Sequence, residues 1–167
     1  YPNIVIADLS SSDISSSRNM IEYSNKFKWY LENFDYIANT NILVSIVLTN
    51  FNSEKTIKQS IESIINQTYK TIELIIVDDG STDDSINIIS KYENLFNVSI
   101  IRLYKNYGCY FAKNIGILLS RGKYIGFQDS DDISSIFRIE KQMKYLLENI
   151  NLDMIFCDII KCNYVIN

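Results

Sequence analysis

The sequence predicts an α/β sandwich, in which a mainly parallel β-sheet is covered by helices and preceded by an N-terminal helical extension. Short runs rich in valine and isoleucine recur from residue 43 onward, and most are followed by segments whose apolar residues have helical spacing. Strands that alternate with helices in this way favour parallel pairing through crossover connections. The 167 residues are 47% hydrophobic and 22% charged, which suits one compact core and argues against disorder.

Residues 1–40 are predicted to form an extension outside the main domain, which covers residues 41–167. A serine-rich stretch at residues 10–17 is typical of a linker or helix cap. Apolar side chains then recur at helical spacing in Met20, Tyr23, Phe27, Tyr30, Leu31, Phe34 and Ile37, which predicts one amphipathic helix. Such an aromatic stripe can bind a partner, but more often it packs on its own domain.

The first half of the main domain is predicted to contain two strand–helix units. Residues 43–49 form a continuous β-favouring run, and residues 54–67 carry a helical stripe of isoleucines. Residues 72–78 predict a second buried strand. After it, Thr82, Asp83 and Asp84 are expected to cap a helix that continues through Tyr92.

The second half continues the alternation. Residues 97–103 predict a third strand, and residues 109–120 a third helix that Gly122 would end in a left-handed conformation. Residues 124–128 predict a fourth strand. A helix capped by Ser134 or Ser135 is expected to run to Asn149, and residues 153–157 predict a fifth strand with Ile159 and Ile160 beyond it.

Charge and composition exclude several functions. The net charge of −4 and the pI near 4.8 lack the basic footprint that nucleic-acid backbones require. The sequence has no histidine, so acid–base chemistry must fall to carboxylates. The odd number of cysteines (Cys109, Cys157 and Cys162) favours reduced packing residues over disulfides or structural zinc. No apolar run reaches the roughly 20 residues that span a bilayer.

The distinctive polar residues follow predicted strands. In parallel sheets, ligands collect beyond the carboxyl ends of the strands, where helix N-termini also point. Four segments fall there: Thr49-Asn50-Phe51-Asn52, Asp78-Asp79-Gly80-Ser81, Asn106-Tyr107-Gly108 and Gln128-Asp129-Ser130-Asp131-Asp132.

The last of these segments carries three crowded carboxylates. Like charges a few ångströms apart repel by about 1 kcal/mol or more near a protein surface, so such clusters hold a cation or stay well solvated. Oxygen ligands favour Mg²⁺ or Mn²⁺ over zinc. Taken alone, the run is more typical of a solvated acidic loop, and its position beside the other strand ends favours the metal site.

The other segments also allow two interpretations each. Asp78 or Asp79 can accept a hydrogen bond from a pyrimidine imide and Gly80 can let the backbone approach a ligand, or the segment merely turns and caps a helix. Phe51 can stack on a nucleobase for about 1 to 3 kcal/mol or anchor the core. Lys113 can reach a diphosphate or be solvated.

Taken together, these segments resemble the family 2 glycosyltransferases of the GT-A fold. The family pattern includes Pro-Thr-Tyr-Asn, Asp-Asp-Gly-Ser-x-Asp and Asp-x-Asp-Asp. In this sequence the matching segments, in the same order, are Thr49-Asn50-Phe51-Asn52, Ser63-Ile64-Ile65-Asn66-Gln67-Thr68-Tyr69, Asp78-Asp79-Gly80-Ser81-Thr82-Asp83, Asn106-Tyr107-Gly108 through Asn114-Ile115-Gly116, Asp129-Ser130-Asp131-Asp132, and Arg138-Ile139-Glu140-Lys141-Gln142. The resemblance covers residues 42–167 and implies a nucleotide-sugar-binding domain.

The resemblance implies a role for each matching residue. Thr49 and Phe51 would line the base pocket, Asp79 would bond the base edge and Asp78 would support it. Asp129 would contact the ribose or a metal-bound water, Asp131 would ligate Mn²⁺ or Mg²⁺, and Lys113 would help neutralise the diphosphate. Asn52, Gly80 and Ser130 complete the implied nucleotide site.

The implied function is metal-dependent, inverting transfer of a sugar from a nucleotide-diphospho-sugar, with UDP favoured, to a glycan, protein or lipid acceptor. A bound cation would stabilise the departing diphosphate, and a carboxylate base would deprotonate the acceptor hydroxyl. That base is expected beyond Asn167, in an acceptor half that this piece of a larger polypeptide lacks, so the piece by itself is expected to transfer sugar poorly. A cytoplasmic location or the cytosolic face of a membrane is expected.

The sequence departs from the family pattern at three places, and two other functions compete. Thr49-Asn50 replaces Pro-Thr, Lys113 replaces arginine, and Gln128 replaces a common apolar residue. The main alternative is a degenerate, non-catalytic module that acts in interaction or carbohydrate binding. A phosphoacceptor receiver domain is disfavoured, because its acidic pair would follow the first strand and a lysine would follow the last.

Overall fold

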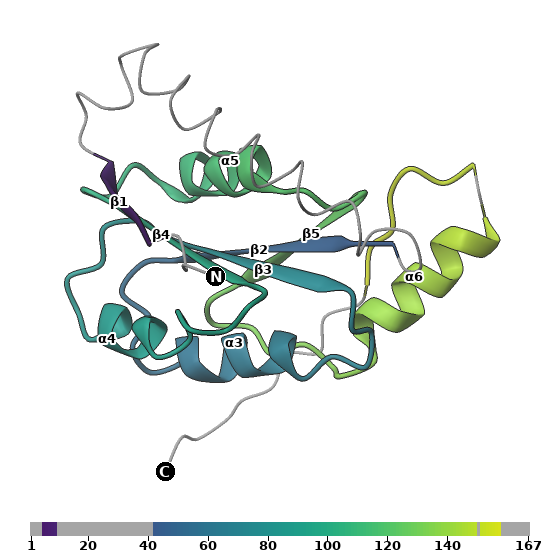
Figure 1. Cartoon of the computed structure of the whole chain (residues 1–167), viewed down its shortest axis with the longest axis horizontal. Coiled ribbons are helices and arrows are strands. Elements are labelled where there is room, and N and C mark those ends of the chain that lie inside the picture. Colours follow the sequence, from purple (N-terminus) through teal and green to yellow (C-terminus); the bar gives the residue numbers. More distant parts are fainter. Residues whose placement is uncertain (1–4, 10–41, 150, 158–167) are drawn as a thin grey trace.

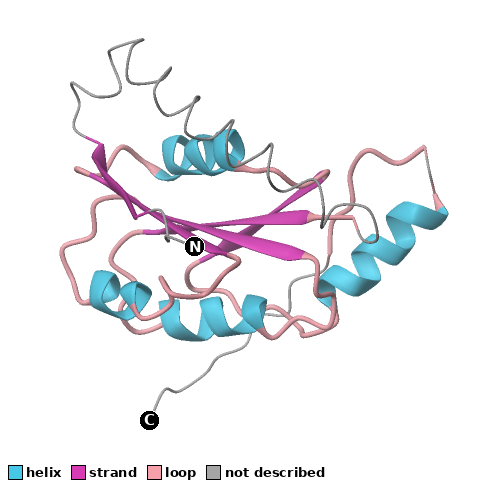
Figure 2. Ribbon diagram, viewed as in Figure 1, coloured by secondary structure: helices cyan, strands magenta, loops and turns pink. Residues whose placement is uncertain are grey.

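The computed structural model describes residues 5–9, 42–149 and 151–157 and shows a parallel sheet between two layers of helices (Figures 1 and 2). Its elements, in chain order, are β1 (Val5–Leu9), β2 (Val44–Asn50), α3 (Ile57–Ile65), β3 (Ile72–Asp78), α4 (Ser85–Ser90), β4 (Val98–Leu103), α5 (Cys109–Leu119), β5 (Tyr124–Asp129) and α6 (Arg138–Glu148). The strand order is β1-β4-β3-β2-β5, and every pairing is parallel. The predicted α/β sandwich is confirmed.

The two faces of the sheet are covered by different helices. Helix α5 packs on one face, whereas α3 and α4 lie across the other, with α6 beside β5 (Figure 2). On the α3 side, alternate residues of β2 and β3 such as Ile46 and Ile76 pack against the isoleucine stripe of α3. On the α5 side, Ile75 and Val77 pack against Ala112. The strands read as continuous apolar runs because β2 and β3 are buried on both faces.

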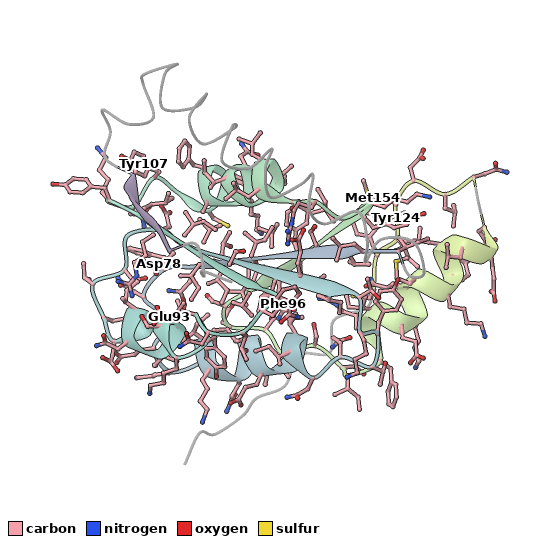
Figure 3. The ribbon with its side chains drawn as sticks, viewed as in Figure 1. Asp78, Glu93, Phe96, Tyr107, Tyr124 and Met154 are labelled. Atoms are coloured by element: carbon pink, nitrogen blue, oxygen red, sulfur yellow. The ribbon has the colours of Figure 1, made fainter. Side chains whose placement is uncertain are left out.

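The strand order has a reversal between β2 and β5. The chain passes from β2 to β3 to β4 in one direction, and then α5 returns it to the other side of β2. At such a reversal the connections leave the carboxyl ends of the two strands on opposite faces, which opens a crevice for ligands. Figure 3 shows the side chains around this framework.

The element boundaries differ from the predictions at several places. Helix α6 begins at Arg138 with Phe137 as its N-cap residue, so neither Ser134 nor Ser135 is the cap, although the Ser135 hydroxyl accepts the amide of Phe137 at 3.4 Å. At α4, by contrast, one of the expected capping residues does bond to the start of the helix, because the Asp83 carboxylate accepts the amide of Ser85, the first residue of the helix, at 3.0 Å. Gly122 is not left-handed. Instead, a Cβ at this position would lie 2.6 Å from the Ser45 backbone nitrogen, so glycine is needed for close approach.

The sheet also gains one strand and lacks another relative to the prediction. Strand β1, which was not predicted, pairs in parallel with β4 at the edge of the sheet. The predicted fifth strand at residues 153–157 is wrong, because this segment has no strand pairing. The predicted helix within residues 10–41, and Ile159 and Ile160, lie outside the described residues, and the domain boundary at residue 40 stays a prediction.

Candidate functional site

The carboxyl ends of β2, β3 and β5 bring the predicted site segments together. The register pairs Thr49 of β2 with Asp129 of β5 on one side and with Val77 of β3 on the other. Asn50 pairs with Asp78, one residue before Asp79. The acidic run and the Asp78-Asp79 pair therefore flank the end of β2, at the reversal of strand order.

The loop after β2 is tied to the loop after β3. Asn52 has a left-handed φ of 50°, which asparagine tolerates better than most residues. The backbone amide of Asn52 donates to the Ser81 hydroxyl at 2.9 Å, and the side-chain oxygen of Asn52 accepts the backbone amide of Thr82 at 2.8 Å. Phe51 is 44% exposed beside this link. Because its ring is not in the core, the ring is available to stack on a flat ligand.

Asp78 and Asp79 are both buried, and both organise neighbouring loops. The Asp78 carboxylate accepts the Asn50 amide at 2.7 Å and the Ser81 hydroxyl at 2.5 Å. The two Asp79 oxygens accept the backbone amides of Tyr107 and Gly108, each at 2.8 Å. Each carboxylate oxygen has a second lone pair, so the base contact of Asp79 stays a prediction. The structure adds a second task for it, which is to fix the loop between β4 and α5.

Gly80 provides a close approach of two backbones. It has a φ of 71°, and a Cβ there would lie 2.5 Å from the carbonyl carbon of Lys105. The neighbour is therefore the chain's own loop between β4 and α5. Any side chain at residue 80 would push this loop away from Asp79, and the expected approach of Gly80 to a ligand stays a prediction.

The acidic turn, which we define as residues 129–132, presents its carboxylates to solvent. Asp129, Asp131 and Asp132 are all exposed. Although the residue as a whole is exposed, partial burial of the Asp132 carboxyl raises its pKa, and the nearby charges of Asp131 and Asp129 raise the pKa further, whereas Arg138 opposes the rise. This crowding of negative charge favours binding of a cation.

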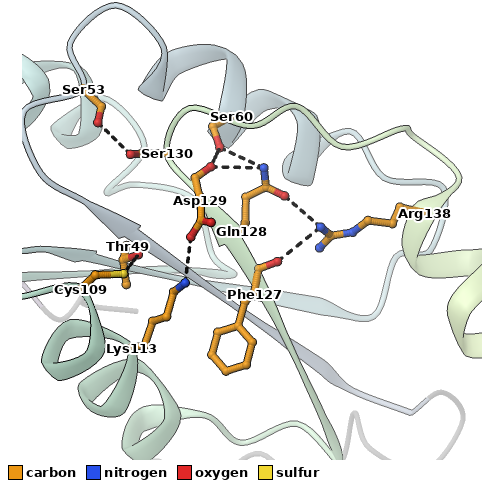
Figure 4. Close-up of polar contacts among 10 residues, drawn as sticks. All are labelled: Thr49, Ser53, Ser60, Cys109, Lys113, Phe127, Gln128, Asp129, Ser130 and Arg138. Carbon is orange, nitrogen blue, oxygen red and sulfur yellow. Dashed lines mark hydrogen bonds and ion pairs between the residues drawn. The ribbon is translucent and has the colours of Figure 1, made fainter. Parts of the chain in front are cut away.

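Lys113 is the cation that already faces the turn. Its Nζ lies 2.9 Å from Asp129 Oδ1 and 5.8 Å from the centre of the Phe127 ring (Figure 4). Burial acts to lower the pKa of Lys113, but the hydrogen bond and charge of Asp129 outweigh it and the pKa lies above its usual value. The ammonium therefore stays charged at neutral pH, beside the predicted diphosphate position.

The donor set of the turn fits a hard divalent ion that keeps ligands from elsewhere. Within residues 5–9, 42–149 and 151–157, no group of three or more His, Cys, Asp and Glu side chains forms a closed metal site. Mg²⁺ characteristically binds through one or two carboxylates together with waters and substrate phosphates. The exposed carboxylates of Asp129 and Asp131 are of this kind, and their assignment as metal ligands stays a prediction.

Cys109 also lies at the site. It is free and exposed at the start of α5, with its Sγ 3.7 Å from the Thr49 hydroxyl. Cys157 is likewise free and exposed. Both are reduced as predicted, but the interpretation of these two residues as packing residues is wrong. Cys162 lies outside the described residues.

A polar network beneath the acidic turn was not predicted from the sequence. The Ser130 and Ser53 hydroxyls are 2.8 Å apart, and Ser60 Oγ donates to the carbonyl of Asp129 at 2.9 Å (Figure 4). Behind them, buried Gln128 contacts the carbonyl of Asp132 and the guanidinium of Arg138. The one signal in the sequence was the polar Gln128 in a strand position where an apolar residue is expected.

Comparison with known families identifies similar proteins. The family model described as "Glycosyl transferase family 2" matches residues 45–167. An uncharacterized glycosyltransferase of Haemophilus influenzae is 42% identical over 108 residues, which cover 64% of this chain and 43% of that protein. The UDP-Glc:alpha-D-GlcNAc-diphosphoundecaprenol beta-1,3-glucosyltransferase WfaP of Escherichia coli is 41% identical over 106 residues, which cover 62% of this chain and 41% of WfaP. The chain thus spans less than half the length of these two curated relatives.

Two solved structures share the architecture. TarS residues 1–349 of S. aureus have a TM-score of 0.61 and 28% identity, over 65% of this chain and 33% of theirs. TarS has also been solved with UDP and with UDP-GlcNAc. The mannosyltransferase PcManGT of Pyrobaculum calidifontis, solved with GDP-Man and Mn²⁺, has a TM-score of 0.59 at 18% identity over 75% of this chain and 39% of its own. That likeness shows the fold alone.

Proposed function

The chain belongs to glycosyl transferase family 2, and we propose that it is the donor-binding part of a metal-dependent, inverting glycosyltransferase that uses a UDP-sugar. The observation that carries this proposal is the acidic turn at the strand reversal, with Lys113 beside it and Phe51 exposed nearby. These groups suit two parts of a nucleotide-sugar, because an aromatic face suits the base and positive charge suits the diphosphate. The acceptor would be a hydroxyl of a glycan, protein or lipid.

In the proposed complex, Phe51 stacks on the base while Asp79 accepts its imide hydrogen. Asp79 is already fixed by the amides of Tyr107 and Gly108, so it offers an oriented acceptor. Thr49, Asn52 and Gly80 shape the surrounding pocket, and Asp78 holds the loops that form it. UDP is favoured because WfaP is described as using UDP-Glc and TarS has been solved with UDP and UDP-GlcNAc.

The diphosphate would lie between Lys113 and the acidic turn. Asp131 and Asp129 would hold Mn²⁺ or Mg²⁺, with Ser130 supporting the turn between them. The bound ion would supply Lewis-acid stabilisation of the negative charge that develops on the departing diphosphate. Lys113, kept charged by Asp129, would neutralise a further part of this charge from the α5 side.

Residues outside the nucleotide site decide the donor sugar and the acceptor. A carboxylate base elsewhere in the full protein would deprotonate the acceptor hydroxyl. The part of the chain that the structure describes contains no helix long and apolar enough to cross a membrane. A location in the cytoplasm or at the cytosolic face of a membrane remains part of the proposal.

Binding of UDP tests the proposal directly. Thermal unfolding would be measured with UDP, with Mn²⁺, and with both, since a ligand at a hundredfold excess over its Kd adds about 2.7 kcal/mol of stability. We expect a clear rise in Tm with UDP and Mn²⁺ together and a smaller rise with UDP alone. In Asp131→Asn, UDP should raise the Tm by the same amount with and without Mn²⁺. No rise at millimolar UDP and Mn²⁺ would favour the degenerate, non-catalytic module.

A further inference from the structure

We infer that Gln128 is a positioning residue that holds the acidic turn in the orientation the donor site requires. The inference rests on the proposed function for its ligand, but its structural part does not. Gln128 lies on β5 directly before the turn and is only 2% exposed. The neighbouring side chains, Phe127 and Asp129, are exposed, as the alternation along a strand requires.

The orientation of the Gln128 amide is fixed by partners that have only one possible role. Its Nε2 donates to the backbone carbonyl of Asp132 at 2.8 Å, and a carbonyl can only accept. Its Oε1 accepts from Arg138 Nη1 at 3.0 Å, and a guanidinium can only donate. Exchange of the two ends would place donor against donor and acceptor against acceptor, so the amide has one orientation.

The remaining hydrogen-bonding positions of the amide are also filled. Ser134 Oγ donates to Oε1 at 2.7 Å, and Nε2 lies 3.3 Å from Ser60 Oγ. Ser60 in turn donates to the carbonyl of Asp129 at 2.9 Å. Both ends of the acidic turn are therefore held from below through their backbone carbonyls. Gln128 holds that of Asp132. Ser60 holds that of Asp129, which Gln128 Nε2 also approaches at 3.4 Å (Figure 4).

This arrangement fixes the main chain and leaves the carboxylates free for a ligand. The amide of Asp132 donates back to the carbonyl of Asp129 at 3.2 Å, which closes the turn. Repulsion among the three carboxylates acts to open it, because their charges crowd the same few residues. Arg138, anchored by Gln128 and by the Phe127 carbonyl, places a positive charge behind the turn and opposes this repulsion.

A second buried glutamine provides a matched control. Gln67 is 1% exposed and also bridges helix α3 to the segment after β5. Its Nε2 donates to the carbonyl of Ser135 at 2.7 Å, and its Oε1 accepts the amide of Ile139 at 3.0 Å. Gln67 thus holds the start of α6 and has no bond to the acidic turn. Gln128→Met and Gln67→Met each remove one buried amide from the same layer and keep its approximate volume.

Amide hydrogen exchange separates the two variants without any ligand. In Gln128→Met, exchange at Asp132 should become about tenfold faster, while Ile139 stays as in the wild type. In Gln67→Met, Ile139 should become faster and Asp132 should stay unchanged. Equal exchange at Asp132 in both variants would overturn the positioning role, whatever the ligand proves to be.

The affinity for UDP then tests whether the held turn serves the donor site. Titration calorimetry would compare Kd for UDP with Mn²⁺ and with EDTA. We expect Gln128→Met to reduce the gain in affinity from Mn²⁺ by about tenfold, the range typical of residues that support metal ligands, and Gln67→Met to change it less than twofold. An undiminished gain in Gln128→Met would overturn the link to the donor site.

Different results would contradict the positioning role of Gln128 and its link to the donor site. If wild-type protein shows no gain from Mn²⁺, the proposed metal-dependent function and this link fall together, whereas faster exchange at Asp132 still supports the positioning role. If Gln128→Met does not fold, Ser60→Ala removes the shorter of the two side-chain contacts to the Asp129 carbonyl, and the same two measurements apply to it. Unchanged exchange at Asp132 and an unchanged Mn²⁺ gain in that variant would contradict the inference.

Discussion

The two ends of helix α5 carry ion pairs of the same kind in opposite surroundings. Near its start, Lys113 pairs with Asp129, and the two side chains are 25% and 52% exposed. Just past its end, Arg121 pairs with Glu73, and these side chains are 11% and 5% exposed. The Glu73 carboxylate also accepts the Ser45 hydroxyl and the Arg121 amide.

Under the proposed function, this difference separates a pair that stabilises the fold from a pair that binds the donor. At the amino end of the sheet, further donors surround the buried Glu73 carboxylate, and both side chains of the pair are largely withdrawn from solvent. At the carboxyl end, Lys113 and Asp129 remain open to solvent beside two more exposed carboxylates. Exposed pairs contribute little to stability, whereas removal of one partner from a buried pair is costly.

The largest effect on stability is expected for Glu73→Gln. This change keeps the shape of the side chain but removes the negative charge that is paired with Arg121 in a buried setting, and breaking such a pair costs about 3–5 kcal/mol. Urea unfolding would measure the loss. The affinity of the folded protein for UDP should stay at the wild-type value. A large drop in this affinity would contradict the claim that the ion pair past the end of α5 serves stability and not binding.

A smaller loss of stability, together with weaker binding, is expected for Asp79→Asn. One of the two amides of Tyr107 and Gly108 would then face an NH₂ group, and an unpaired buried donor costs about 1–3 kcal/mol. Because the same residue is proposed to bond the base, UDP affinity should fall as well. Calorimetric titration with UDP and EDTA would isolate the base contact from the metal, and an unchanged Kd would exclude Asp79 from the base site.

Lys113→Met should reverse the pattern of Glu73→Gln. Since the pair with Asp129 is partly exposed, the free energy of unfolding should change by no more than about 1 kcal/mol. The affinity for UDP with Mn²⁺ should nevertheless fall by about tenfold, because a charge-assisted contact to the diphosphate is lost. If stability fell as far as in Glu73→Gln while UDP binding persisted, the two ends of α5 would not differ in role.

The smallest effect, and the only gain in stability, is expected for Asp132→Asn. Burial and the charges of Asp131 and Asp129 raise the pKa of Asp132 in the folded state, so its ionised form is disfavoured on folding. The asparagine variant should therefore have a higher Tm at pH 7. The difference in Tm between the variant and the wild type should shrink as the pH falls through the folded-state pKa of Asp132. It should vanish below the ordinary pKa of 3.8, where Asp132 is protonated in both the folded and the unfolded state.

Melting curves at several pH values would check this prediction. A variant that is less stable than wild type at pH 7 would show that the acidic turn is not under electrostatic repulsion. Added Mn²⁺ should remove the advantage of the variant, since a bound cation relieves the same repulsion.

The centre of the fold was predictable because burial leaves a strong mark on sequence. Strands β2 and β3 read as unbroken apolar runs since both of their faces are covered, and α3 shows a clear isoleucine stripe. The edges were less predictable. Residues 153–157 have a strand-like composition but no pairing partner, and β1 is recognised only through its pairing with β4.

The candidate site was predictable in its residues but not in its support. Their positions after predicted strands were enough to predict that Phe51, Asp79 and the acidic turn lie at one edge of the sheet, and the register of β2 with β3 and β5 confirms this. By contrast, the contact of Ser60 with Gln128 joins residues 68 positions apart, and each looks ordinary in its own segment. Hydrogen bonds of this kind depend on how α3 packs against β5, which no local pattern encodes.

A crystal structure of the protein with UDP and Mn²⁺ tests the central claim most directly. We expect the metal at Asp131, the diphosphate between the metal and Lys113, and the base against Phe51 with its imide toward Asp79. Metal density away from Asp131, or base density away from both Phe51 and Asp79, would contradict it.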